Sequence, residues 1–152
     1  MQVLNEVFPT DPARFSAMME KGPDGPIFMV NLLKFKDRAA YDDGRSYDLS
    51  GRDACMIYGR AVTELLPKFG GRGIFAADFT FLALGQVEEL WDEVAIAMYP
   101  DRASMVRMSL SEEWREIAVH RSAGLKGQLN IETVLPQSAV ASPFLEMIKA
   151  QS

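Results

Sequence analysis

Two residues, Asn31 and His120, carry side chains suited to oxyanion or acid–base chemistry. Asn31 interrupts the apolar stretch "PIFMVNLLKFK" at 26–36. Leaving its amide buried and unpaired costs roughly 1–3 kcal/mol, so a ligand, a water, the backbone or another side chain must pair with it. His120 is the only histidine, and therefore the first candidate for a general base near neutral pH. We predict catalytic roles for both residues; the alternatives are a core amide bonded to a neighbour and a histidine at a helix C-terminus.

Three further side chains are candidates for substrate binding: Tyr58, Tyr99 and Arg121. Arg121 follows the histidine directly, and its guanidinium can bind a carboxylate through two parallel hydrogen bonds. The alternative is an ion pair with Glu113 or Glu116. The two tyrosines are amphipathic, so each either lines a pocket with its hydroxyl exposed to the ligand or lies at the edge of the core.

Two charged residues within apolar strands also need an explanation. Asp78 is expected to pair with Arg72 or Arg60, or else to lie in a cleft with a raised pKa. Lys34 comes three residues after Asn31, so in a regular strand the two side chains point to opposite faces. We therefore expect Lys34 at a rim or an interface.

The order of helical and strand patterns predicts a single α+β domain over residues 1–152, with its core at 26–135. An N-terminal helix at 11–21 begins with Asp11 as N-cap, and a tail follows at 136–152 with a short helix at 142–150. The core reads as β-α-β-β-α-β, the ferredoxin-like arrangement with helices on one face of a four-stranded antiparallel sheet. Its expected elements are a strand at 27–35, a helix capped by Ser50 and ended by "GGRG", strands at 73–84 and 90–99, two helical pieces within 101–125 that restart at Ser111, and a last strand in "KGQLNIETVLP".

The expected strands are apolar on both faces, whereas a sheet covered on one face should alternate between apolar and polar residues. In the strand at 73–84, one face carries Phe75, Ala77, Phe79, Phe81 and Ala83, and the other carries Ile74, Ala76, Leu82 and Leu84. Both faces must therefore be covered. We predict a homodimer that packs sheet against sheet, the alternative being terminal helices folded across the second face.

Composition excludes several classes of protein. A net charge of −5 without a basic cluster argues against nucleic acid as a partner. The single cysteine excludes an internal disulfide and a Cys-rich zinc site, the single histidine excludes a multi-histidine centre, and we predict no metal site. No apolar run reaches the length of a membrane span and the N-terminus lacks the pattern of a signal peptide, so we expect no membrane partner and a cytoplasmic protein.

Four phrases resemble one known family: "VNLLKFK", "YGRAVTELLPKFGGR", "WDEVAIAMYPDRASM" and "HRSAGL". In this order they are similar to the DUF1330 family, and the resemblance covers roughly residues 26–133. DUF1330 belongs to the dimeric α/β-barrel superfamily, in which two ferredoxin-like subunits close their sheets into a barrel. The resemblance therefore implies a dimeric α/β-barrel, and many members of the superfamily bind substrate between the sheet and the helices.

The resemblance also implies roles for individual residues. Asn31 is similar to a strand-one asparagine with which some superfamily monooxygenases hold substrate or oxygen, and Arg121 to the arginine of the family's "HR" pair. His120 lies near the position of the haem-ligating histidine of haem-degrading relatives. Those relatives carry a tryptophan about three turns earlier, where this chain has Ser109 or Leu110, so we expect no haem and no other cofactor.

The expected function is binding of a small hydrophobic or cyclic molecule in a cleft between sheet and helices. If the protein is an enzyme, the resemblance favours a cofactor-independent oxidoreductase or isomerase: a monooxygenase, an isomerase or a cyclase. The alternative is a non-catalytic ligand-binding protein or a structural dimer. Three or more of the five candidate side chains lining one pocket would favour catalysis, and scattered polar groups around an apolar cavity would favour binding.

Overall fold

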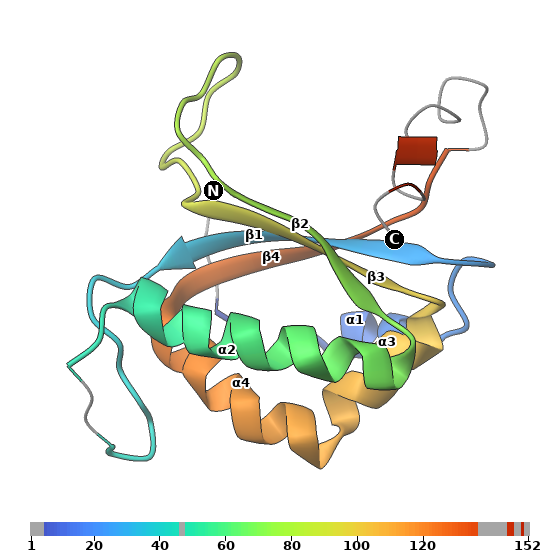
Figure 1. The fold of residues 1–152 in the computed structure, drawn as a ribbon, viewed down its shortest axis with the longest axis horizontal. Coiled ribbons are helices and arrows are strands. Elements are labelled where there is room, and N and C mark those ends of the chain that lie inside the picture. Colours follow the sequence, from blue (N-terminus) through green and yellow to red (C-terminus); the bar gives the residue numbers. More distant parts are fainter. Residues whose placement is uncertain (1–4, 46–47, 137–145, 148–149, 151–152) are drawn as a thin grey trace.

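A computed structural model describes residues 5–45, 48–136, 146–147 and 150 of the chain. Four antiparallel strands form one sheet in the order β2-β3-β1-β4, and α2 and α4 cover one face of it (Figure 1). The elements are α1 (Pro12–Met19), β1 (Ile27–Phe35), α2 (Gly51–Leu65), a 3-10 turn (Leu66–Phe69), β2 (Arg72–Asp78), β3 (Glu93–Tyr99), α3 (Arg102–Leu110), α4 (Glu112–Gly124) and β4 (Leu125–Thr133). The prediction of a ferredoxin-like α+β fold is confirmed. Most of the helix expected at 142–150 falls outside the described residues.

Each long helix begins where the sequence offers a capping side chain. Asp11, Ser50, Asp101 and Ser111 accept hydrogen bonds from backbone N–H groups two or three residues further on, which satisfies donors that a helix N-terminus leaves free. The predicted caps and the restart at Ser111 are therefore confirmed. No helix among the described residues is long and apolar enough to span a membrane.

The core lies between the sheet and the helices α2 and α4. The odd-numbered residues of β1 point into it, because Ile27 and Met29 pack in one buried cluster and Leu33 in a second. The first cluster also holds Leu65, Leu66, Tyr99, Met108, Trp114 and Ala118, and the second holds Cys55 and Leu125. Asn31 is also an odd-numbered residue of β1, so its side chain points toward the helices. The side chain of Lys34 points to the opposite face, as predicted.

A pair of glycines lets the two long helices approach closely where α2 begins and α4 ends. A Cβ atom placed on Gly124 would lie 2.3 Å from the carbonyl oxygen of Gly51 and 2.9 Å from the amide nitrogen of Cys55. A Cβ on Gly51 would in turn lie 2.1 Å from the carbonyl oxygen of Lys36. Both contacts involve backbone atoms that cannot swing aside, so only glycine fits at either position.

The second face of the sheet carries apolar side chains, and none of the helices α1–α4 covers it (Figure 1). The register places on it Phe28, Val30 and Leu32 of β1, Phe75 and Ala77 of β2, Val94, Ile96 and Met98 of β3, and Leu129 and Ile131 of β4. Phe75 is 55% exposed and Ile131 is 45% exposed. The apolar residues that the sequence predicted on both faces of the sheet are thus present. We call this second face of the sheet the open face.

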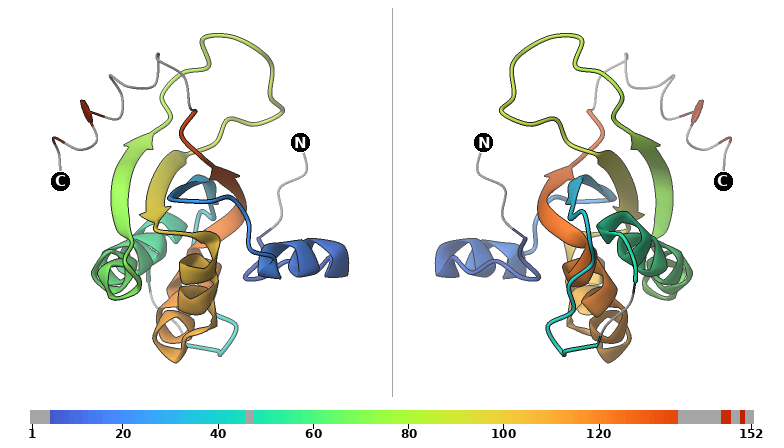
Figure 2. Two further views of the ribbon diagram at one scale, coloured as in Figure 1. Left: turned by 90° about the vertical axis from the view of Figure 1, so that its right-hand side faces the viewer. Right: turned by 90° about the vertical axis from the view of Figure 1, so that its left-hand side faces the viewer.

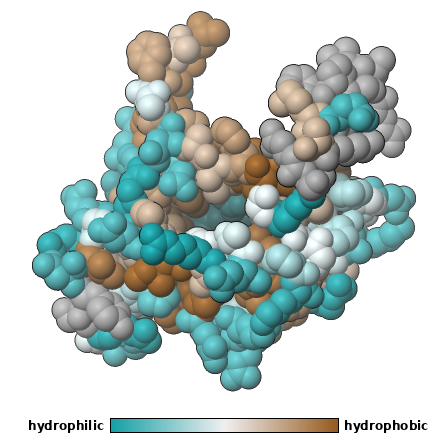
Figure 3. Space-filling view, viewed as in Figure 1, coloured by the Kyte–Doolittle hydropathy of each residue, from teal (hydrophilic) through white to brown (hydrophobic). Residues whose placement is uncertain are grey.

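The predicted extent of the second and third strands, 73–84 and 90–99, is wrong. β2 ends at Asp78 and β3 begins at Glu93, while residues 79–92 form an arm that rises on the side of the sheet away from the helices (Figures 1 and 2). The pairing of β1 with β3 ends at Leu33 opposite Glu93, and the pairing of β2 with β3 ends at Asp78 opposite the same residue. Phe81 and Leu84 on the arm are 80% and 90% exposed, and apolar residues gather there in Figure 3.

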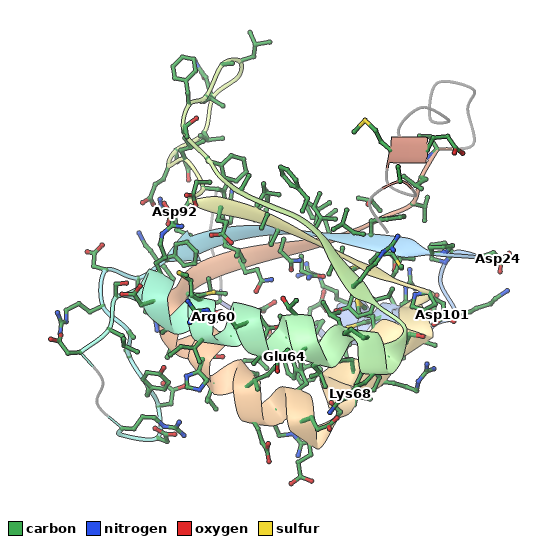
Figure 4. All side chains as sticks on the ribbon, in the orientation of Figure 1. Asp24, Arg60, Glu64, Lys68, Asp92 and Asp101 are labelled. Atoms are coloured by element: carbon green, nitrogen blue, oxygen red, sulfur yellow. The ribbon has the colours of Figure 1, made fainter. Side chains whose placement is uncertain are left out.

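A cluster of charges holds the base of the arm to β1. The ammonium group of Lys34 donates to the carbonyl oxygen of Leu90 at 2.8 Å and to Oδ1 of Asp92 at 3.0 Å, and it lies 3.2 Å from Oε1 of Glu89. Asp92, labelled in Figure 4, also accepts the backbone N–H of Phe35 at 2.8 Å. Lys34 therefore anchors the arm.

The glycine contact predicts opposite effects for two glycine substitutions. Gly124→Ala should destabilise the protein by roughly 1–3 kcal/mol, because the added methyl group overpacks two backbone segments. The matched control is Gly59→Ala in α2, where a Cβ would meet nothing within 4 Å, and where alanine should add roughly 0.5–1 kcal/mol. Urea unfolding of both variants measures the difference. A Gly124→Ala protein as stable as the wild type would contradict this packing of α2 against α4.

Candidate functional site

The amide of Asn31 is fully hydrogen-bonded within the fold. Its Nδ2 donates to the carbonyl oxygens of Met29 and Ala95, each at 3.2 Å. Its Oδ1 accepts from Nε2 of Gln128 at 2.6 Å and from Nδ2 of Asn130 at 2.5 Å. With two donors and two acceptor positions used, the geometry suits Asn31 to positioning the two β4 amides rather than to presenting a free group to a ligand.

Gln128 connects this cluster to Arg121 on α4. Its Oε1 accepts from Nη2 of Arg121, and the same nitrogen donates to the carbonyl oxygen of Glu6 at 2.8 Å. The polar side chains thus form a chain from exposed Asn130 on edge strand β4, through Asn31 and Gln128, to the buried guanidinium. Two candidates predicted from the sequence, Asn31 and Arg121, lie in one network.

The guanidinium of Arg121 is buried without an opposite charge. The residue is 7% exposed, and among the described residues it forms no ion pair, with Glu113 or Glu116 or with any other acid. Its Nη1 is a buried donor without a hydrogen-bond partner. Burial lowers the pKa of Arg121 below its ordinary value, but a guanidinium keeps its charge at neutral pH. The fold therefore holds a buried positive charge with a donor that has no partner among the described residues.

The N-terminal segment covers Arg121 at the end of α4. Nδ2 of Asn5 donates to the carbonyl oxygens of Ser122 and Leu125, at 3.2 and 3.0 Å. Further along the segment, Phe8 packs edge-on against Trp114 with ring centroids 5.7 Å apart. These contacts fix residues 5–8 across the helix.

Both candidate tyrosines lie in the same layer as Arg121. The hydroxyl of Tyr58 accepts from Nε1 of Trp114 at 3.1 Å, and burial raises the pKa of Tyr58 and of Tyr99. Tyr99 belongs to the buried core cluster. Burial also raises the pKa of the Cys55 thiol to about 11, so this cysteine is protonated and unreactive at neutral pH.

His120 lies apart from the other four candidates. It projects from α4 toward the loop before α2, where its Nδ1 lies 2.7 Å from the hydroxyl of Tyr41. The two rings meet edge-on at 5.5 Å. Burial, and next the nearby charge of Arg45, lower the pKa of His120, while Asp43 raises it. The fold therefore separates the one histidine from Asn31 and Arg121.

An apolar groove of about 410 Å³ runs between the N-terminal segment, the loop at 41–43 and the outer side of α4. Val7, Phe8, Trp114, Ala118 and Val119 line it. Arg121 is not among the residues that line it. A small aromatic or aliphatic group fits a groove of this volume and lining.

Asp78, the remaining charged candidate, forms an ion pair with a different arginine from the two that were predicted. Asp78 accepts from Nη1 of Arg52 at 2.7 Å, instead of pairing with Arg72 or Arg60. This pair lies at the surface, where Arg52 also lies over the ring of Phe35, so Asp78 is no part of a cleft. Arg52 was not foreseen because it comes from the first turn of α2, far away in sequence.

Sequence reasoning also missed Gln128 and Asn130, which belong to the network, and Asn5, which bonds the end of α4. Gln128 and Asn130 occupy alternate positions of "KGQLNIETV", and two amides on one face of a strand next to Asn31 were a readable signal. For Asn5 the sequence holds no such signal, because its position over α4 depends on tertiary contacts.

The environment of His120 predicts a pH dependence of stability. Its pKa in the folded protein is lowered below the unfolded value of about 6.5. The unfolded chain therefore takes up the proton first, and the free energy of unfolding should fall as the pH drops through about 6.5. An NMR titration of the imidazole and urea unfolding of wild type and His120→Gln at several pH values measure both effects. A His120 pKa at or above 6.5 would contradict the described burial.

Comparisons with known proteins place the chain by its likeness to solved structures. No model of a known protein family matches it, and no curated protein does. The RPA0582 protein of Rhodopseudomonas palustris, described as of unknown function, is 30% identical with a TM-score of 0.75, over 89% of this chain and 99% of that chain. Methylated RPA0582 is 32% identical with a TM-score of 0.76, over 89% and 97%. A dimeric ferredoxin-like protein of unknown function from Jannaschia sp. CCS1 is 11% identical with a TM-score of 0.49, over 72% and 99%. The chain therefore belongs to the same family as the RPA0582 protein.

Proposed function

We propose that the protein binds a small molecule with an anionic oxygen group, a carboxylate in the simplest case, at Arg121. The observation that carries the proposal is the buried guanidinium with a free Nη1 and no acid beside it in the described part of the chain. Burying an unpaired charge is strongly unfavourable, whereas a bound carboxylate supplies both the opposite charge and an acceptor. Binding of such a ligand would relieve this cost.

The neighbourhood of Arg121 also supports an apolar ligand body. Phe8 of the N-terminal segment packs edge-on against Trp114, and the groove along α4 is lined mainly by apolar side chains. Exposed Asn130 marks the other approach, from the edge of β4 along the amide chain. The ligand class is thus a compact aromatic or aliphatic acid, in keeping with the hydrophobic or cyclic molecule expected from the sequence.

The groups around Arg121 support binding more than catalysis. The titratable side chains that act on its charge are Tyr58 and Cys55, and burial raises the pKa of both, so both are protonated at neutral pH. His120, the natural general base, faces Tyr41 instead. We therefore favour a cofactor-independent ligand-binding protein over a monooxygenase, isomerase or cyclase. We also propose that the protein belongs to the DUF1330 family, because the four sequence phrases quoted above occur in the order seen in that family.

The binding proposal predicts different effects of one variant on affinity and on stability. Arg121→Met should lower the affinity for phenylacetate by at least about tenfold, because the only buried positive charge of the site is gone. The free energy of unfolding without ligand should change by less than about 1 kcal/mol, because an unpaired buried charge is replaced by an apolar side chain. Calorimetric titration and urea unfolding measure the two quantities.

Two controls accompany that experiment. Wild-type protein should bind phenylacetate but not 2-phenylethanol, which has the ring without the charge. His120→Gln should bind phenylacetate like the wild type, because the histidine lies elsewhere. Equal affinities of wild type and Arg121→Met for phenylacetate, or the absence of carboxylate binding to the wild type, would refute the proposal.

We further propose that two copies pack through their open faces, as in a dimeric α/β-barrel. The support is the breadth of the apolar open face and the exposure of Phe81 and Leu84 on the arm beside it (Figure 3). Contiguous apolar surfaces of this kind mark interfaces. A partner on the open face must lie alongside the arm, because the arm rises on that side of the sheet (Figure 2).

Sedimentation equilibrium tests the dimer. Wild-type protein should be a dimer at micromolar concentration, and Ile96→Glu should shift it to monomer, because a charge at the centre of the open face is desolvated in the interface. Leu110→Glu is the matched control: Leu110 is 47% exposed on α3, on the helix side of the sheet. A monomeric wild type, or Leu110→Glu and Ile96→Glu acting alike, would contradict the proposal.

A further inference from the structure

The arm at 79–92 carries large apolar side chains that its own subunit leaves exposed. Phe81 is 80% exposed and Leu84 is 90% exposed, and Leu82 and Val87 on the same arm are 38% and 41% exposed. A single exposed apolar residue is ordinary, but several on one projecting segment mark a surface of contact with another molecule. The arm therefore needs a partner that covers it.

Two groups of charges fix the base of the arm, one on each face of the sheet. On the open face, Lys34 bonds Oδ1 of Asp92 at 3.0 Å. On the helix side, Nη1 of Arg52 donates to Asp78 at 2.7 Å and to Glu93 at 3.3 Å. These contacts set the direction of the arm before any partner binds, so that less ordering of the arm opposes association.

The apolar surface of the open face continues onto the arm. The register places Phe75 and Ala77 on the open face. The N–H of Phe79 donates to the carbonyl oxygen of Asp92 at 2.9 Å, so the pairing of the hairpin extends one residue beyond β2. Alternation along the strand then places Phe79 on the same side as Ala77. A molecule that covers the open face thus also contacts the base of the arm.

A second copy of the chain matches this combined surface. A twofold dimer uses the same surface patch on both subunits, so an apolar face meets an apolar face. The arm rises on the side of the sheet that the second copy would occupy (Figures 1 and 2). The arm of each subunit then lies beside the other subunit, where its apolar side chains can be covered.

We infer that the arm of each copy clasps the other copy, with Phe81 and Leu84 buried against the partner subunit. The inference rests on the dimer proposed above, which requires only contact between the open faces. It adds a second contact surface outside the sheet and assigns a role to a segment that the sequence predicted to be strand. The open faces determine which surfaces meet, and the arms tighten the dimer.

Sedimentation equilibrium of a double variant tests the clasp. Phe81→Ser with Leu84→Ser should raise the dissociation constant of the dimer at least about tenfold, because two large apolar side chains no longer contribute to the interface. The matched control is Met56→Ser with Leu110→Ser, which removes two side chains that are 46% and 47% exposed on the helices α2 and α3. This control should keep the wild-type dissociation constant.

The outcomes separate the clasp from the dimer itself. A wild type that is monomeric would overturn both the proposed dimer and the clasp. A wild-type dimer that Ile96→Glu dissociates, but that the arm variant and its control leave equally tight, would overturn the clasp alone. Flotation of the wild type with phosphatidylcholine vesicles, lost in the arm variant while its dimer stays as tight as the wild type, would assign the arm to a lipid surface and likewise overturn the clasp.

A chemical probe reports the burial of the arm directly. The thiol of Leu84→Cys should react with iodoacetamide several-fold more slowly in the dimer than in the same variant made monomeric by Ile96→Glu. The native Cys55 adds little background, because it is buried and its pKa is raised to about 11. Equal rates of alkylation in dimer and monomer would show that the arm stays exposed in the dimer, and would overturn the inference.

Discussion

The positive charge of Arg121 is the constraint on which the site depends. It is buried between the sheet and the helices, where described residues accept its hydrogen bonds through carbonyl oxygens and none forms an ion pair with it. Hydrogen bonds that a guanidinium donates to neutral carbonyl oxygens orient it without neutralising its charge. The amide chain through Gln128 and Asn31 therefore holds the charge in place, and the opposite charge is left for a ligand to supply.

The fold brings this charge to its position through α4. Ser111 starts the helix, and Gly124 ends it against Gly51, so that α4 crosses the sheet close to α2. Arg121 falls in the last turn and points toward β4, where the register places Asn130 beside Asn31. The same helix carries His120 on another side, which is why two consecutive residues take part in separate contacts.

Much of this architecture was readable in the sequence, because helix caps and apolar periodicity are local signals. Asp11, Ser50 and Ser111 start their helices as predicted, and the β-α-β-β-α-β order gives the sheet. The arm could not be predicted, since apolar residues at 79–84 read alike in a strand and in an exposed extension. The site was foreseen in part: Asn31 and Arg121 share a network, whereas the contacts of Asn5 and Arg52 join segments far apart in sequence.

The most direct test of the central claim is a crystal structure of the protein with 4-bromophenylacetate, in which the anomalous signal of bromine locates the ligand. The account predicts the carboxylate within about 3 Å of Nη1 of Arg121, the distance of a charge-assisted hydrogen bond, with the ring beside Phe8 and Trp114. A ligand bound elsewhere, with Nη1 of Arg121 satisfied by a water or by a side chain, would contradict it.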